Sequence, residues 1–208
     1  MDLAVWGLVA GSGWASGVNL YLVVTLLSGA GRLGLLDVPE LFLRNDVLIA
    51  AIVLTALEFV ADKIPLLDSA WDVVHTAIRP LGAAMVGYAL GGDAPGAEQI
   101  TAALTSAGLA LASHLAKATA RAAINASPEP VSNIVASIAE DSLVVGVLVL
   151  AVIAPILAIV AVAVLLVAGT ALALMLVSLA RRGRRRLQAR RAERRGGGPP
   201  PPPKVSRP

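Results

Sequence analysis

Long apolar runs separated by short polar breaks dominate the chain, a pattern that is typical of helical membrane proteins. A hydrocarbon core about 30 Å thick needs about 20 apolar residues in a helix, and several runs reach or exceed that length. The predicted fold class is therefore all-α, a polytopic transmembrane helical bundle with about six spans. The predicted spans are residues 4–28, 47–61, 68–90, 99–124, 142–153 and 156–180.

Proline, glycine and capping residues mark the ends of these runs. Pro65 is expected to end the second span, and Pro155 divides an uncharged run that is too long for one crossing. Asp46 and Asp68 carry the type of side chain that caps a helix N-terminus. Residues 131–140 are expected to form a short interfacial helix before the short fifth span. The sequence thus predicts broken or short helices among the full spans.

The six spans divide into two halves of three, residues 1–92 and 98–180. Two short matches relate the halves, an Ala-Ser pair at 15–16 and 112–113 and an aspartate at 46 and 141. An odd number of spans per half inverts the second copy, which is the architecture of many transporters. Six spans would also place both termini in the cytoplasm. The matches are few, so chance similarity is the alternative to a repeat.

Composition supports a membrane location and separates a body from a tail. The chain is 57% hydrophobic and 15% charged, whereas soluble domains are about 25% charged. Residues 181–208 carry eleven Lys or Arg and one Glu, while residues 1–180 carry six basic and thirteen acidic residues. Because the basic segment follows an apolar run, the positive-inside rule favours a cytoplasmic tail that attracts anionic lipid headgroups over a nucleic-acid-binding segment. The Gly- and Pro-rich tail is expected to be disordered, and residues 1–180 to form the transmembrane domain.

The chain contains no cysteine, which excludes disulfides, thiolate nucleophiles and cysteine-bound metals. An acid at position 2 stands where a signal peptide needs a basic residue, so the first apolar run is expected to be a retained span. No HExxH or G-x-S-x-G pattern is present. We therefore expect neither an enzyme nor a cofactor, and the sequence leaves a homo-oligomer open.

Two polar stripes interrupt the apolar helices. Asp68, Asp72, His75 and Arg79 follow one another at i, i+4, i+7 and i+11, which places them on one helical face. Glu58 and Asp62, also four residues apart, lie just before this stripe. The first stripe and the residues before it are mainly acidic.

The second stripe is mainly basic and consists of His114, Lys117, Arg121 and Asn125, again on one face. In the six-span topology both stripes start at the cytoplasmic side. A charge at the bilayer centre costs at least about 2.5–3.5 kcal/mol, so we expect the stripes to face inward and pair, for example Asp72 with Lys117 or Arg121.

Three interpretations of these charges remain open at this stage. They line a water-filled cavity between the third and fourth spans of a transporter or channel for a small polar solute or ion. Alternatively, they only neutralise one another and fix helix registry in a non-transporting scaffold or assembly factor. A third interpretation is hydrolytic or metal chemistry at the histidines. The candidate substrate- or ion-binding residues are Asn19, Glu58, Asp62, Asp72, His75, Arg79, His114, Lys117, Arg121, Glu129, Asn133, Glu140 and Asp141.

Three segments, residues 14–21, 58–80 and 127–141, are similar to the domain-of-unknown-function 4126 family of bacterial integral membrane proteins. The first reads WASGVNLY, the second EFVADKIPLLDSAWDVVHTAIRP, and the third begins SPEPVSN. The resemblance implies a small multi-pass protein of the bacterial inner membrane and covers residues 5–180. It implies no activity.

Overall fold

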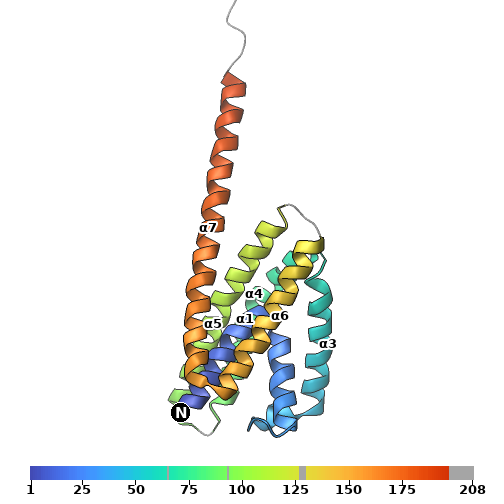
Figure 1. Cartoon of the computed structure of the whole chain (residues 1–208), viewed down its shortest axis with the longest axis vertical. Helices are drawn as coiled ribbons and strands as arrows, with labels where there is room; N and C mark the ends of the chain where they lie inside the picture. The colour runs from blue at the N-terminus through green and yellow to red at the C-terminus, as the bar shows by residue number, and fades with distance from the viewer. Residues whose placement is uncertain (65, 93, 127–129, 197–208) are drawn as a thin grey trace, which may run out of the picture.

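The computed structural model describes residues 1–64, 66–92, 94–126 and 130–196, and every regular element in them is a helix. Figure 1 shows an elongated bundle from which the last helix projects. The helices are α1 (Leu3–Arg32), α2 (Glu40–Leu43), α3 (Asn45–Ala61), α4 (Leu67–Leu90), α5 (Gly96–Ile124), α6 (Pro130–Ile153) and α7 (Pro155–Gly196).

Among the described residues, four helices are long and apolar enough to cross a membrane. The chain is therefore an all-helical membrane protein, but six spans are not confirmed. The four segments are Leu3–Arg32, Leu67–Leu90, Val131–Ile153 and Pro155–Arg185.

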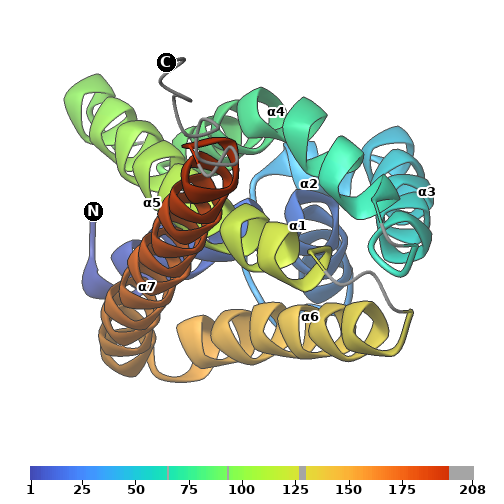
Figure 2. The same cartoon turned by 90° about the horizontal axis from the view of Figure 1, so that it is seen from above.

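Helix α1 is interrupted at Asn19, whose backbone is extended (φ −151°, ψ 95°). The chain turns back at this residue, so the two arms of α1 form a V with its apex at mid-height in the bundle (Figures 1 and 2). Leu8 in the first arm and Leu27 in the second line one cavity together with Val152 near the end of α6. The span predicted at residues 4–28 is therefore not one continuous helix, because it is interrupted at Asn19 and both arms reach the same end of the bundle.

The Asn19 side chain explains why the helix can restart here. Its Oδ1 accepts a hydrogen bond from the backbone N–H of Leu22 at 3.0 Å, which is the N-cap contact to the third residue of a new helix. In an unbroken helix that N–H would bond the carbonyl of Val18, four residues earlier. The break thus frees carbonyls at the end of the first arm, and their new partners are charged side chains described below.

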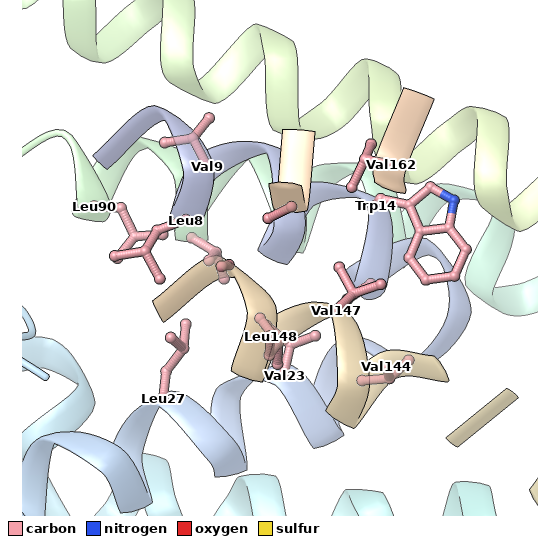
Figure 3. Close-up of a cluster of buried hydrophobic side chains, with 14 of the residues drawn as sticks. Leu8, Val9, Trp14, Val23, Leu27, Leu90, Val144, Val147, Leu148 and Val162 are labelled. Carbon is pink, nitrogen blue, oxygen red and sulfur yellow. The ribbon is translucent and has the colours of Figure 1, made fainter. Parts of the chain in front are cut away.

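An apolar core fills the space between the arms of α1, α6 and α7 (Figure 3). Val9 and Val23 come from the two arms, and Val147 and Leu148 come from α6; each is at most 5% exposed. Many large apolar side chains elsewhere face outward, including Val73, Leu81 and Val167. Exposed apolar residues on nearly every helix agree with a lipid environment.

The two described termini lie at opposite ends of the bundle. The N-terminal amine contacts Glu98 at the start of α5, and α7 begins beside the first arm of α1. Helix α7 then runs past the far end of the bundle, where α3 and α5 end (Figure 1). The prediction that both termini lie in the cytoplasm is not confirmed. The basic segment also differs from the predicted disordered tail, because residues 181–196 continue α7 as helix.

The helix boundaries correct two further predictions. Residues 131–140 and 142–153 are not separate helices but parts of one continuous α6, while the predicted break at Pro155 is confirmed. Asp46 and Asp68 lie in the first turns of α3 and α4 and are not the N-cap residues, which are Arg44 and Leu66. Pro65 lies outside the described residues.

The predicted inverted repeat is not confirmed. Ser106, Ser113 and Lys117 of α5 donate hydrogen bonds to the carbonyls of Val9, Trp14 and Val18 of α1. These contacts advance together along both helices, so the first arm of α1 and α5 run parallel. In an inverted repeat these two helices, which contain the matching Ala-Ser pairs, would run in opposite directions.

Candidate functional site

The charged residues gather around the apex of α1, where α3, α4, α5 and α6 meet it. We call this set the charged core; its members are Glu58, Asp62, Asp68, Asp72, Arg79, Lys117, Arg121, Glu140 and Asp141. All but Glu140 and Asp141 are buried, and those two are half-buried. Two further elements, the apex carbonyls and the pair of histidines, complete the site.

Arg79 of α4 joins α1, α3 and α5 and is fully buried. Its Nη2 donates to Glu58 Oε1 at 2.6 Å, and its Nη1 donates to the Gly17 carbonyl at 3.0 Å. The same Nη1 lies 3.2 Å from Asp72 Oδ1. One guanidinium therefore serves two carboxylates and the broken end of α1.

Lys117 of α5 holds the neighbouring apex carbonyl. Its Nζ donates to the Val18 carbonyl at 3.0 Å and to Asp62 Oδ2 at 2.7 Å. Glu140 Oε2 and Glu58 Oε1 lie 3.5 and 3.7 Å from the same nitrogen. The ammonium is thus surrounded by oxygens, as a buried lysine requires.

Arg121, one helical turn further along α5, ties α6 to the end of α3. Its Nε and Nη2 make a forked contact with Glu140 at 3.2 and 2.6 Å, and its Nη1 donates to the Asp62 carbonyl at 2.9 Å. The same nitrogen donates to Asn133 at 3.3 Å. A forked arginine–carboxylate pair is among the stronger charge-assisted contacts in proteins.

The contacts fix the role of one nitrogen in each histidine ring. Arg79 has only donors, so His114 Nδ1, 2.7 Å from Arg79 Nη1, must accept, which makes this ring neutral. Its proton is then on Nε2, which donates to Thr76 Oγ1 at 3.1 Å. In His75 the Nδ1–H donates to the Trp71 carbonyl at 2.8 Å, and Nε2 lies 2.9 Å from the Tyr21 hydroxyl. Neither ring bonds to a carboxyl group of the core.

The rim of the core is held by amides. Asn19 Nδ2 donates to Asp141 Oδ1 at 3.2 Å, which anchors the apex of α1 to α6. Asn125 Nδ2 donates to Asp68 Oδ1 at 2.7 Å, and Asn125 Oδ1 accepts from Asn133 Nδ2 at 3.1 Å.

Most predicted site residues do come together, but their pairing differs from the expectation. The described candidates among them all lie in or beside the charged core, whereas Glu129 lies outside the described residues. Asp72 was expected to pair with Lys117 or Arg121 and instead lies beside Arg79, the next basic residue on its own helix. Asp62 takes the place predicted for Asp72 on Lys117.

The sequence did not reveal the parts of the site contributed by the backbone. Nothing in the residue types at Gly17 and Val18 indicates that their carbonyls bind cations. Tyr21 was missed as well, because a tyrosine in an apolar run reads as an interfacial anchor.

Several buried oxygens of the core receive no hydrogen bond from the described residues. They are Glu58 Oε2, Asp62 Oδ1, Asp68 Oδ2 and both oxygens of Asp72. Within the described part of the chain, no group of three or more acidic or histidine side chains is arranged to hold a metal ion.

The two stripes contact each other directly across α4 and α5, through Arg79 with His114 and through Asp68 with Asn125. A cavity of about 160 Å³ instead lies on the other side of α5, between α1, α6 and α7. Lys117 and Glu140 line it, and its other walls are mostly apolar, with Trp14 and Leu166 among them. This cavity is not the one predicted between the third and fourth spans, which stays a prediction.

Comparison with known proteins gives one match. The family described as Domain of unknown function (DUF4126) matches residues 7–175, which include α1 to α6 and the first half of α7. No curated protein and no solved structure matches the chain.

Proposed function

The chain belongs to the DUF4126 family, and from this premise and the charged core we propose that it moves a small polar solute or ion across a membrane. In this proposal the arrangement described above is a closed state. The charged core is the occluded site, and the adjoining cavity at Lys117 and Glu140 is the remnant of an access route.

The observation that carries the proposal is the interrupted α1 with its apex in the charged core. Inside a bilayer, non-helical backbone is tolerated only where protein covers it or where it lines a water-filled cavity. Transporters use such interrupted helices because freed carbonyls and helix ends bind ions and solutes near the membrane midplane. Here the freed carbonyls of Gly17 and Val18 are held by Arg79 and Lys117, which are cations able to release them.

The proposed orientation follows from the basic segment of α7. Arginine-rich segments next to a span stay in the cytoplasm, so the end of the bundle with residues 181–196 faces inward. The N-terminus and the turn at residues 33–38 then face outward. The proposed location is the bacterial cytoplasmic membrane, where anionic headgroups would meet the basic helix.

A second candidate function is a membrane scaffold or assembly factor without transport. The direct contacts between the two stripes favour it, because buried charges that satisfy one another can serve only to fix helix positions. The two functions differ in whether the wild-type chain carries an ion flux and in whether a replacement that keeps the net charge lowers that flux.

The test replaces the buried pair Asp62 and Lys117 together, as Asp62→Asn with Lys117→Gln, which leaves the net charge unchanged. The purified full chain is reconstituted in phosphatidylethanolamine and phosphatidylglycerol vesicles, and fluxes of H⁺, Na⁺ and K⁺ are measured with ion-sensitive dyes. We expect a flux above that of empty vesicles and at least about a tenfold loss in the double variant, since removing a paired buried charge changes a pathway strongly.

The same replacement at the exposed pair Arg44 and Asp46, as Arg44→Gln with Asp46→Asn, is the matched control and should leave the flux unchanged. Wild-type fluxes equal to those of empty vesicles for all three ions, with a folded protein, would favour the scaffold function.

A further inference from the structure

The charged core contains more acids than bases. Six carboxyl groups, at positions 58, 62, 68, 72, 140 and 141, face the three buried cations Arg79, Lys117 and Arg121. Lys63 lies on the rim and donates to Ser137. If it is counted as well, the core has six acids and four cations. Neither histidine ring bonds to one of these carboxyl groups, so among the described residues some cations must be shared by two acids.

An uncompensated carboxylate buried in a bilayer protein is costly, and such groups usually take up a proton or a cation instead. Glu58 and Asp72 both depend on the single guanidinium of Arg79, but they are not equivalent. Glu58 receives a short charge-assisted hydrogen bond of 2.6 Å, which an ionised carboxylate prefers. Neither oxygen of Asp72 receives a hydrogen bond, although the residue is only 3% exposed.

The surroundings of Asp72 on every packed element agree with a neutral group. Charged neighbours are Arg79 on its own helix, Asp62 and Glu58 of α3, Lys117 of α5 and Glu140 of α6. Each nearby cation is already engaged by another acid: Arg79 by Glu58, Lys117 by Asp62, and Arg121 by Glu140. Tyr21 bonds to His75, and His114 contacts Arg79, Thr76 and the backbone of Asp72, so none of these three residues bonds to the carboxyl oxygens of Asp72.

We propose that Asp72 is a proton-binding site that is occupied in this closed arrangement, so that the ion coupled or moved by the protein is H⁺. This inference rests on the proposed function for its biological role, but the protonation of Asp72 is a separate claim. The step is a simple association in which one carboxylate oxygen of Asp72 takes up H⁺ from water and releases it in the open state.

Infrared difference spectroscopy tests the site directly, because a protonated carboxyl group has a carbonyl-stretch band that a carboxylate lacks. The full chain in phosphatidylethanolamine and phosphatidylglycerol vesicles is titrated across neutral pH. We expect a protonated-carboxyl band at neutral pH that is lost in Asp72→Asn and shifted in frequency in Asp72→Glu. Asp46→Asn, at an exposed acid, should leave the band unchanged.

A spectrum without a protonated carboxyl at neutral pH, or a band that persists at full height in folded Asp72→Asn, would overturn the proposal. The Asp72→Glu variant, which keeps the carboxyl group, serves if Asp72→Asn does not fold, and an unshifted band there would also overturn it. A band that disappears on addition of Na⁺ would identify Na⁺ as the ligand and equally contradict the claim.

Proton flux into the same vesicles, followed with a pH-sensitive dye, separates this inference from the proposed function. The band without any flux would refute proton transport and leave the proton site standing. Flux that survives in Asp72→Asn would refute Asp72 as the site and leave transport standing.

Discussion

The apolar core between the arms of α1 and the charged core at its apex are both buried, but they contribute to the structure in different ways. In the apolar core, side chains such as Val9, Val147 and Leu148 exchange lipid contacts for protein contacts of the same kind. Burial against a neighbouring helix therefore stabilises the fold much less than it would in water. Most of the stabilisation in this region comes from close packing of the side chains. In the charged core, the loss of a partner would leave a buried charged side chain unpaired, which would destabilise the folded protein.

This difference teaches which region decides how the helices are arranged. Apolar surfaces of similar shape can pack in several ways, whereas the contacts of Arg79 with α1, α3 and α5 are met by one arrangement only. Glu58 also attaches α3, whose outer side chains such as Ile52 and Val53 are exposed, to the rest of the bundle. The charged core thus fixes the fold in addition to any role in transport.

The largest effect is expected from removing the shared cation. Arg79→Met removes the charge-assisted hydrogen bond of buried Glu58 and the ion pair of Asp72, so we expect a loss of about 3–5 kcal/mol in the free energy of unfolding. Truncation in the apolar core, as in Val147→Ala, should lower the free energy of unfolding clearly less. In the unfolded state lipid makes contacts with this side chain of the same kind as the protein makes in the folded state, so less is lost. Unfolding titrations in mixed micelles measure both.

Arg44→Met is the control for the change of residue type, because Arg44 and its partner Asp46 are exposed and should contribute nothing measurable. If Arg79→Met lowers the free energy of unfolding by less than Val147→Ala does, the charged core does not contribute more to stability than the apolar core, and the comparison is wrong.

A smaller effect is expected at the close approach of α1 and α5. A Cβ atom added at Gly17 would clash with the Ala110 carbonyl and the Ser113 hydroxyl. Gly17→Ala should therefore lower the free energy of unfolding by about 1–3 kcal/mol, as overpacking of a tight interior does. It should also weaken ion flux, because the Gly17 carbonyl is a partner of Arg79.

The matched control is Gly29→Ala in the second arm of α1, where a Cβ meets open space. It should be neutral or slightly stabilising, because alanine favours helix over glycine. Equal losses for the two variants would show that the apex does not approach α5 as described.

The sequence predicted the helical class and the members of the charged core because ionisable residues in apolar runs need inward partners. Glu140 and Asp141 show where that reasoning failed. Two acids in a row indicated a helix start, but they lie inside α6, since Arg121 and Asn19 supply their partners. Their burial depends on residues far apart in the chain, which local patterns do not reveal.

The reversal of α1 at Asn19 was the main feature that the sequence did not show. Asparagine within a run of 30 helical residues indicates a hydrogen bond to a neighbouring helix, and that contact exists, to Asp141. The capping bond to Leu22 was missed because a cap is expected before an apolar run and not in its middle. The predictions of six spans and of a cytoplasmic N-terminus assumed that residues 4–28 cross the membrane, and neither prediction is confirmed.

The position of the N-terminus relative to the turn after α1 tests the central claim, that α1 turns back at the charged core. The chain has no cysteine, so single cysteines can be placed at Asp2, at Leu35 in the turn and at Gln188 in the basic part of α7. They are labelled with a membrane-impermeant thiol reagent in intact cells. The structure predicts that positions 2 and 35 are labelled together and that position 188 is protected; labelling at 35 with protection at 2 would mean that α1 crosses the membrane and would contradict this account.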